Sequence, residues 1–249
     1  EDYLGNGGVL ETDLYPAKIK AAYISKANSS NARAMNFIFN IGKQEVRQQI
    51  WMTNKEGEVI YKDKNTGKEK NLPGFNQVNS LCLLITGKEV GNMEVDERTV
   101  NIYDYDAKKE LPSSVDCFVE LHDEDVMIAL QKQTVDKTLR NESTGEYENT
   151  GKTRDINTVV KFFAPDPVVT ISEVSEFIKS LGGDFNDEVE NGNILKAISK
   201  MGEDSGNYAT KWLEKNKGQT YNKSSGKKEE GKKFNKTSSS SETKKSLFD

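Results

Sequence analysis

Three segments near the start of the chain alternate apolar and polar side chains with a period of two. They cover residues 14–24, 35–41 and 45–53, and polar turns separate them at 28–31 and 42–43. Because successive side chains of a β-strand point to opposite faces of a sheet, this alternation is typical of half-buried strands. Short polar connections suit neighbouring strands that run antiparallel, so we expect a three-stranded antiparallel meander.

The alternation also assigns a face to each side chain. In the first strand we place Tyr15, Ile19 and Tyr23 on the buried parity. In the third strand Trp51 shares the parity of Arg47 and lies opposite the apolar positions. The indole is therefore expected to be exposed, with a place in the core as the alternative.

A small hairpin and a helix are expected next. The hairpin covers residues 59–71, and its three-residue turn at 65–67 contains a glycine that can adopt a left-handed conformation. Apolar side chains then recur at helical spacing over residues 75–85. Gly87 suits the C-terminal cap of that helix.

Two further strands and a short helix follow. We expect strands over residues 99–105 and 126–135, and between them a short helix over 113–121 that begins at a serine cap. The last strand continues into an arm that leaves over residues 136–140 and returns over 158–163. Such a ribbon could lie along a ligand.

The order strand, strand, strand, helix, strand, strand is that of the OB-fold, a partly open barrel that binds oligonucleotides or oligosaccharides. The predicted fold is therefore mainly β with helices: a five-stranded OB-fold-like barrel with an extended β-arm, a small helical C-terminal segment and a disordered tail. A different small β-barrel, or an α+β sheet with the same element order, is the alternative.

The helical segment is expected over residues 166–215. Thr170 and Glu173 have the spacing of a capping box at the start of an amphipathic helix. Further short helices are expected around residues 194–201 and 208–215.

The tail, residues 216–249, is rich in Lys, Ser, Gly and Thr. Ordering a chain costs about 1–2 kcal/mol per residue, and this segment has too few apolar side chains to offset that cost. We expect it to be disordered and to bind a partner protein through Leu247, Phe248 and Asp249. The chain then divides into an OB-fold-like domain (1–165), a helical appendage (166–215) and the tail (216–249).

Charge is unevenly distributed along the chain. The formal net charge is −5, and the tail carries nine lysines against four acidic residues, or +5, so the remainder is at −10. An acidic body does not fit a uniformly basic nucleic-acid-binding protein. Any such site has to be a local stripe of Lys and Arg.

The cysteines and the apolar runs indicate a cytoplasmic protein. Cys82 and Cys117 both lie in apolar segments, which favours buried, reduced thiols. No apolar run is long enough for a signal peptide or a membrane span. We expect the protein to be soluble and cytoplasmic.

The residue pattern does not favour an enzyme. His122 is the only histidine, and its acidic neighbours fit a surface polar residue better than a catalytic base. The acidic groups at residues 104–106 and 123–125 lack a third carboxylate for a two-metal site. The sequence contains no P-loop, C-x-x-C or G-x-S-x-G motif. We expect a binding protein with no cofactor and no metal.

Binding of single strands without sequence preference needs a basic groove and exposed aromatic rings on which bases stack. The candidates for stacking are Trp51, Tyr61 and Tyr103. The basic candidates come from the first turn, the third strand, the hairpin and the arm: Lys20, Arg33, Arg47, Lys55, Lys62, Lys132, Lys137, Arg140 and Arg154. Charges of this kind are also typical of an ordinary solvated surface, which is the alternative.

Several stretches of the chain resemble single-stranded DNA-binding proteins encoded by lytic tailed bacteriophages. They are residues 71–75 (NLPGF), 79–84 (NSLCLL), 100–106 (VNIYDYD), 132–137 (KQTVDK) and the opening at 2–5 (DYLG). The resemblance covers roughly residues 1–165 and the end of the tail, and it leaves the helical segment unplaced.

The resemblance implies an OB-fold that coats single strands during viral replication and recombination, in the cytoplasm of the host cell. It also implies a tail that recruits replication or transcription proteins. In that class the tail is normally acidic and ends in Phe, whereas this tail is net basic and Phe248 is followed by Asp249. This departure puts in doubt a partner pocket that grips the carboxylate of a terminal Phe.

The function predicted from the sequence is non-enzymatic binding and protection of single-stranded DNA, with partners recruited through the tail. The rival is a phage interaction or transcription-regulating protein that binds a polymerase and contacts nucleic acid only nonspecifically. Self-association stays open.

Overall fold

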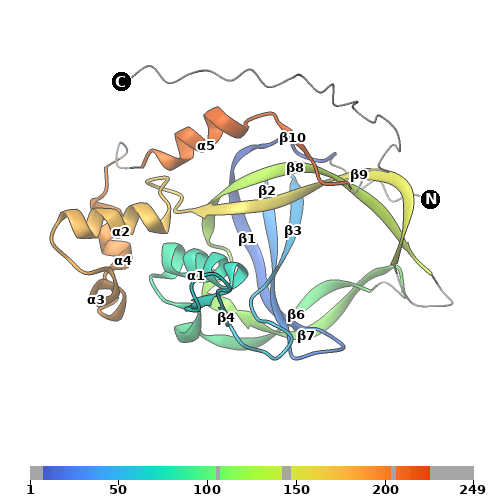
Figure 1. The fold of residues 1–249 in the computed structure, drawn as a ribbon, viewed down its shortest axis with the longest axis horizontal. Helices are drawn as coiled ribbons and strands as arrows, with labels where there is room; N and C mark the ends of the chain where they lie inside the picture. Colours follow the sequence, from blue (N-terminus) through green and yellow to red (C-terminus); the bar gives the residue numbers. More distant parts are fainter. Residues whose placement is uncertain (1–7, 105–106, 142–146, 203–205, 225–249) are drawn as a thin grey trace, which may run out of the picture.

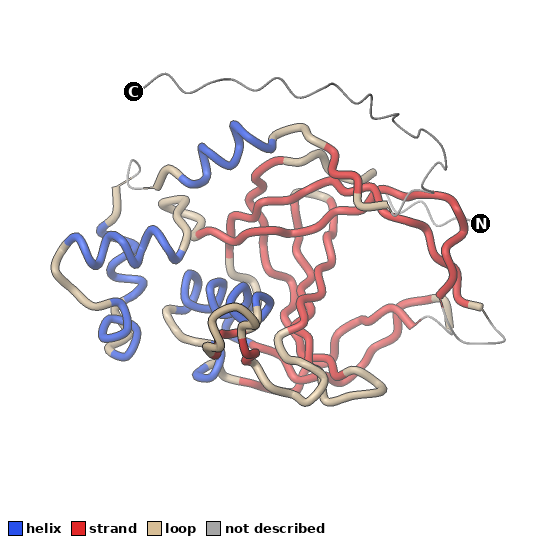
Figure 2. The backbone as a smooth tube through the Cα atoms, viewed as in Figure 1, coloured by secondary structure: helices blue, strands red, loops and turns tan. Residues whose placement is uncertain are grey.

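One eight-stranded sheet, a two-stranded hairpin and a group of helices make up the part of the chain that the computed structural model describes, residues 8–104, 107–141, 147–202 and 206–224 (Figures 1 and 2). The strands are β1 (Asp13–Lys26), β2 (Arg33–Ile41), β3 (Gln44–Trp51), β4 (Ile60–Lys62), β5 (Glu69–Asn71), β6 (Val95–Asp104), β7 (Lys109–Phe118), β8 (Asp125–Arg140), β9 (Tyr147–Phe163) and β10 (Thr220–Asn222). The α-helices are α1 (Pro73–Thr86), α2 (Ile171–Ser180), α3 (Phe185–Glu190), α4 (Ile194–Lys200) and α5 (Tyr208–Asn216). The prediction of a mainly β fold with helices is confirmed.

The predicted antiparallel meander is confirmed as β1, β2 and β3. Its inner face builds the core, where the rings of Phe37 and Phe39 lie 5.4 Å apart, and each lies 5.9 Å from the ring of Phe162 on β9. Val46 and Ile50 of β3 join the same cluster. The other parity of β2 and β3 faces away from this core.

A β-bulge in β1 reverses the faces predicted for the end of that strand. The pairing register with β2 shifts between Ile19 and Ala21. Ile19 belongs to the main core, but Tyr23 packs with Ile38 on the opposite side of the sheet. The prediction that Tyr23 shares the buried parity of Ile19 is wrong, because one extra residue inverts the alternation that follows it.

The loop before β8 holds this bulge in place. The backbone N–H of Asp123 donates to the carbonyl of Ile19 (2.8 Å), and the N–H of Ile19 donates to Glu124 (2.9 Å). His122 accepts the N–H of Ala22 at its Nε2 (3.2 Å). The only histidine therefore satisfies a backbone donor at the bulge.

The predicted hairpin and helix are both confirmed. β4 and β5 pair antiparallel, and α1 covers one end of the sheet with buried side chains that include Val78, Leu81 and Cys82. The helix ends where predicted, with Gly87 in the left-handed conformation. Gly74 lies against the end of β3, where a Cβ atom would stand 2.0 Å from the carbonyl oxygen of Trp51.

The short helix predicted over residues 113–121 is wrong. Residues up to Phe118 form β7, which pairs with β6 from Val95 to Asp104, and only the 3₁₀ turn Val119–Leu121 is helical. The alternation of half-buried and exposed residues along β7 is a strand period that the serine cap signal obscured. This β6–β7 ribbon joins the sheet at one point, where Cys117 pairs with Tyr23.

The predicted arm is confirmed as the long antiparallel pair β8 and β9. One edge of β8 pairs with β9, and the other pairs first with β1 and then with β10. The sheet is not closed into a barrel, because among the described residues no backbone ladder joins β3 to β9. The N–H of Val159 instead donates to the side chain of Gln48 (2.9 Å), and α1 lies over this opening.

The helices after β9 share the core of the sheet. The predicted capping box at α2 is confirmed, since Thr170 and Glu173 each accept a backbone N–H of the other. Glu173 also accepts the N–H groups of Asn207 and Tyr208 at the start of α5 (2.9 and 2.8 Å). One carboxylate thus fixes two helix N-termini. The helices predicted around 194–201 and 208–215 correspond to α4 and α5, whereas α3 was not predicted.

The first part of the predicted disordered tail is ordered. Gly218 donates its N–H to the carbonyl of Thr12 (2.8 Å), and β10 then pairs in parallel with Lys132–Thr134 of β8. The half-buried Tyr221 bonds Asn216 through its hydroxyl. Composition concealed this strand because its partners are backbone groups of β8, which any sequence can pair with. Leu247, Phe248 and Asp249 lie outside the described residues.

In the described ranges, no helix combines the length and the apolar character that crossing a membrane requires.

Candidate nucleic-acid interface

The outer face of β1–β3 is polar and aromatic. On β3 the exposed parity carries Arg47, Gln49 and Trp51, as predicted, and register places Asn36 of β2 opposite Gln49. The two amides bond each other, with Gln49 Nε2 donating to Asn36 Oδ1 (3.0 Å). Asn36 Nδ2 donates to Ser25 on β1 (2.8 Å). Neighbouring strands thus hold these polar groups in one orientation.

The β6–β7 ribbon forms a wall above this face. Its side chains Val100, Ile102 and Val115 pack on the cluster that Tyr23 and Ile38 form on the sheet. A groove of ≈ 580 Å³ lies between the ribbon and the sheet, and we call it the sheet groove. Its outer-face and ribbon lining comprises Tyr23, Ser25, Asn36, Ile38, Arg47, Gln49, Ile102, Tyr103 and Val115.

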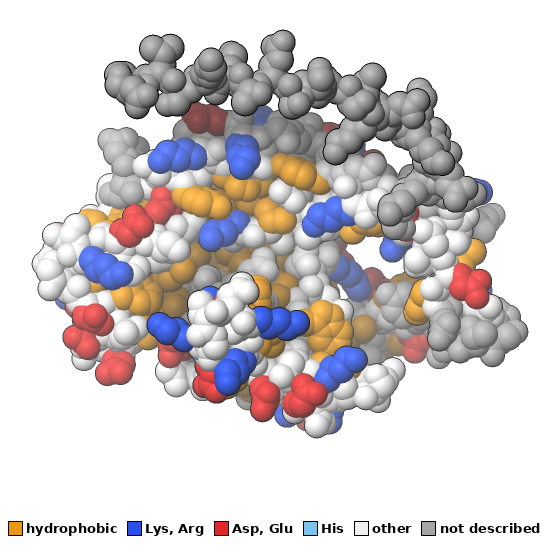
Figure 3. Space-filling model, viewed as in Figure 1, with side chains coloured by type: hydrophobic (Ala, Val, Ile, Leu, Met, Phe, Trp, Pro, Cys, Tyr) orange, Lys and Arg blue, Asp and Glu red, His pale blue; other side chains and the backbone are white. Residues whose placement is uncertain are grey.

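The ribbon and the arm extend toward the same side of the molecule (Figures 1 and 2). In the space-filling view the surface is hollowed between the sheet and these two extensions, and Lys and Arg side chains lie around the hollow (Figure 3). An extended ligand in the sheet groove would therefore pass between two ribbons.

Arg47 lines the groove and is held between two acids. Its guanidinium bonds Glu45 through Nε and Nη2 (2.9 and 2.8 Å) and Glu110 of β7 through Nη2 (2.5 Å). Burial acts to lower the pKa of Arg47, but the bonds to Glu45 outweigh it and the pKa is raised. Burial likewise acts to raise the pKa of Glu45, but Lys20 and Arg47 hold that pKa below its usual value. The guanidinium stays charged and is fixed in position.

The predicted stacking residues are all exposed but do not gather in one place. Trp51 is 47% exposed and Tyr103 is 42% exposed. Tyr103 lines the sheet groove, and Trp51 follows on the strand face that carries Arg47. Tyr61 is 40% exposed on the β4–β5 hairpin and is not part of the groove lining.

The predicted basic residues differ in their surroundings. Lys20 bonds Glu45 (2.7 Å) and so shares that carboxylate with Arg47. Lys132 is half-buried and bonds Glu11 (2.8 Å), which raises its pKa, and it does not line the groove. The remaining described basic candidates are exposed: Arg33, Lys55, Lys62, Lys137 and Arg154. The side chain of Arg140 lies outside the described residues.

Sequence reasoning missed several groove residues. Asn36 is a polar position of the second strand in the sequence. Because it alternates with the apolar core positions, its amide could have been predicted to line the groove. Tyr23 could not, because the bulge determines that it lies on the groove side of the sheet. Glu110 could not either, since its contact with Arg47 requires the β6–β7 ribbon to fold over the sheet.

Among the described residues there is neither a candidate metal site nor a cysteine with a lowered pKa. Within the described ranges, no three His, Cys, Asp or Glu side chains are placed to hold a metal ion. Cys82 and Cys117 are free and buried, and burial raises the pKa of Cys82 to about 12. A thiol in that state is protonated at neutral pH and is a poor nucleophile.

No protein-family model matches the chain, and no curated protein matches it either.

Proposed function

We propose that the protein binds single-stranded DNA along the sheet groove. The observation that carries the proposal is the groove itself, which combines a fixed guanidinium and oriented amides on the outer face of β2 and β3 with the exposed ring of Tyr103 on β6. Single strands expose the faces of their bases, and stacking a base on an aromatic side chain contributes about 1–3 kcal/mol. Trp51 and Tyr103 would supply the rings, and Arg47 would contact phosphate.

The strand connectivity supports an OB-type arrangement. β1 lies between β2 and β8, β9 follows β8, and α1 covers the opening between β3 and β9. A five-stranded, partly open barrel binds oligonucleotides on the face of its second and third strands and through the loops after its first and fourth strands. Those features correspond here to the outer face of β2 and β3, to residues 27–32 and to the β8–β9 arm.

Electrostatics predict binding that depends strongly on salt. Phosphates would compete with Glu45 and Glu110 for Arg47, while the exposed Lys137 and Arg154 extend the basic contacts along the arm. Each neutralised phosphate contributes a slope of about −0.7 to log K against log salt concentration for single strands. The acidic body would repel nucleic acid away from this track.

The cellular role that we propose follows the resemblance to phage single-stranded DNA-binding proteins. The protein would coat and protect exposed strands during replication and recombination, and residues beyond 224 would recruit other proteins.

A binding titration tests the proposal. Oligothymidylate and a duplex of matched length are titrated against the full chain between about 50 and 200 mM salt. We expect preference for the single strand and a linear loss of log K with log salt concentration. Arg47→Gln should weaken binding and flatten the slope, whereas Lys132→Gln, which removes a lysine that does not line the groove, should do neither. Equal affinity for duplex, or no salt dependence, would favour the rival function of protein interaction.

A further inference from the structure

A second hollow lies among the C-terminal helices, at the opposite end of the molecule from the ribbons (Figure 1). It has a volume of ≈ 260 Å³ and lies between α2, α3 and α4. We call it the helix pocket. Its lining comprises Phe177, Ile178, Leu181, Gly183, Glu188, Asn193, Lys196, Ala197 and Lys200.

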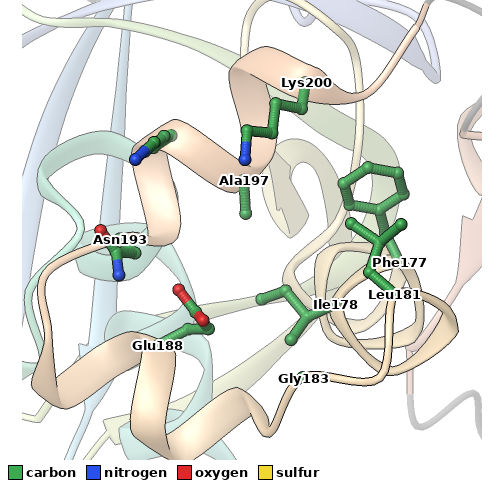
Figure 4. A pocket seen from close by; sticks show the side chains of 9 residues that line it. Phe177, Ile178, Leu181, Gly183, Glu188, Asn193, Ala197 and Lys200 are labelled. Carbon is green, nitrogen blue, oxygen red and sulfur yellow. The ribbon is translucent and has the colours of Figure 1, made fainter.

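The helix pocket has an apolar floor with charges around it. Figure 4 shows Phe177 and Ile178 of α2 and Leu181, which directly follows that helix, with Ala197 across the pocket on α4. Leu181 is 67% exposed, the highest value among the exposed large apolar side chains of the described ranges. An apolar side chain that covered Leu181 would remove this surface from water.

The charged side chains that line the helix pocket include both lysines and a glutamate. Lys196 and Lys200 are exposed on α4, and among the described residues neither has a carboxylate within 4.0 Å. The carboxylate of Glu188 points into the hollow between α3 and α4 (Figure 4). A complementary ligand would combine apolar groups with an acidic group for the lysines and a basic group for Glu188.

We propose that residues 245–249 of this same chain bind in the helix pocket. The segment reads Lys245, Ser246, Leu247, Phe248, Asp249. Leu247 and Phe248 are the only large apolar side chains beyond residue 224 besides Phe234. They match the apolar floor, Asp249 matches the two lysines, and Lys245 matches Glu188. This inference does not depend on nucleic-acid binding.

The intervening chain is long enough. The described chain ends at Ser224, and 20 residues, 225–244, separate it from the segment. Fully extended they would span roughly 65–70 Å, whereas a domain of this size has a radius of gyration of about 17 Å. The extended segment is therefore longer than the body is wide.

Because the segment is tethered to the body, even a low intrinsic affinity is sufficient for it to occupy the helix pocket. A short flexible linker gives an effective concentration in the millimolar range. A segment whose dissociation constant in trans is about 1 mM would then occupy its own pocket about half of the time. Such binding would hold the apolar segment until a partner with higher affinity displaces it.

Hydrogen exchange on the full chain tests this inference. Exchange of amides within residues 177–200 is compared between the parent chain and Phe248→Ala. We expect exchange to become about twofold faster in the variant, as release of a half-occupied site predicts. Phe234→Ala is the matched control, because it removes an aromatic ring of the same linker but not of the segment, and it should leave these rates unchanged.

Charge reversal tests the same contact from the side of the pocket. The pair Lys196→Glu and Lys200→Glu should give the same faster exchange as Phe248→Ala, and adding Asp249→Lys should restore the parent rates. The control pair Lys211→Glu and Lys215→Glu on α5, which is exposed and outside the pocket, should not. Equal rates in the parent chain and in Phe248→Ala would overturn the inference. So would protection that rises with protein concentration, because it would assign the pocket to a second copy.

Discussion

Trp51 is large and apolar, yet half of its surface is exposed. The alternation along β3 places Trp51 on the face of the sheet away from the core residues Val46 and Ile50. Its partner on the neighbouring strand β2 is the small Ala34. The ring therefore contributes little to the core. Its exposure on the face of β3 that also carries Arg47 and Gln49 is what a base-stacking role requires.

Trp51→Ala is predicted to weaken single-strand binding by about 1–3 kcal/mol, because it removes one stacking platform. The free energy of unfolding should change little. Equilibrium titration and urea denaturation measure the two quantities. The fluorescence change on adding DNA should also disappear in the variant, since the remaining Trp212 is buried. A loss of about 3–5 kcal/mol of stability would instead identify Trp51 as a core residue.

Asp63 organises the turn of the β4–β5 hairpin through its carboxylate. The ammonium of Lys70 (2.5 Å) and the backbone N–H groups of Thr66 and Asn65 lower its pKa from 3.8 to about 2. Because the folded pKa lies below the unfolded one, this stabilisation is complete above pH 3.8 and is lost as the pH falls toward 2.

An NMR titration of the Asp63 carboxyl should therefore show a midpoint near 2. In Lys70→Met the midpoint should move upward, because the largest contribution to the shift is removed, while the backbone donors keep it below 3.8. The matched variant Lys68→Met removes an ammonium of the same hairpin that does not bond the Asp63 carboxylate, and it should leave the midpoint in place. Identical titrations in all three proteins would contradict this account of the turn.

At the scale of elements, α1 packs closely against β3 because Gly74, at the point of contact, has no side chain. A Cβ atom at Gly74 would stand 2.0 Å from the carbonyl oxygen of Trp51 and 3.2 Å from the side chain of Ile50. The backbone of Gly74 belongs to α1 and the carbonyl of Trp51 belongs to β3, so neither group can move without moving its element. The first turn of α1 and the end of β3 are therefore fixed against each other.

Gly74→Ala is predicted to destabilise the protein by at least about 1–3 kcal/mol, the usual cost of overpacking. Gly91→Ala is the control, because a Cβ atom there meets nothing within 4 Å, and it should change stability by less than about 0.5 kcal/mol. Urea denaturation compares them. If the two variants proved equally stable, α1 and β3 would not be in the contact described.

Local sequence patterns predicted the elements that depend on local interactions. The meander, α1 and the capping box of α2 follow from alternation, helical spacing and a cap within four residues of sequence. The reversed face of Tyr23 could not be predicted, because the bulge near Lys20 is held by His122 and Asp123, which are distant in sequence. For the same reason the sequence predicted Arg47 and Tyr103 of the sheet groove but not Tyr23.

At the scale of the whole molecule, β10 joins the last helix to the sheet. Thr12 is fully buried, and its hydroxyl donates to the carbonyl of Gln219 (2.5 Å) while accepting the N–H of Lys132 (2.9 Å). Lys217 also bonds Asp13 (2.9 Å). Residues that composition assigned to a disordered tail therefore complete the hydrogen bonds at the start of β1.

Two truncations separate this strand from the rest of the tail. A chain that ends after Ser224 should keep the parent's free energy of unfolding within about 0.5 kcal/mol, because it retains every contact of β10. A chain that ends after Asn216 should be less stable by at least about 1–3 kcal/mol, because the buried Thr12 hydroxyl loses its acceptor and its carbonyl loses the Gly218 donor. Urea denaturation of the three proteins measures the differences. Equal stability of the two truncated chains would show that β10 does not stabilise the sheet. Residues 217–224 would then contribute as little to the free energy of unfolding as the residues that follow them.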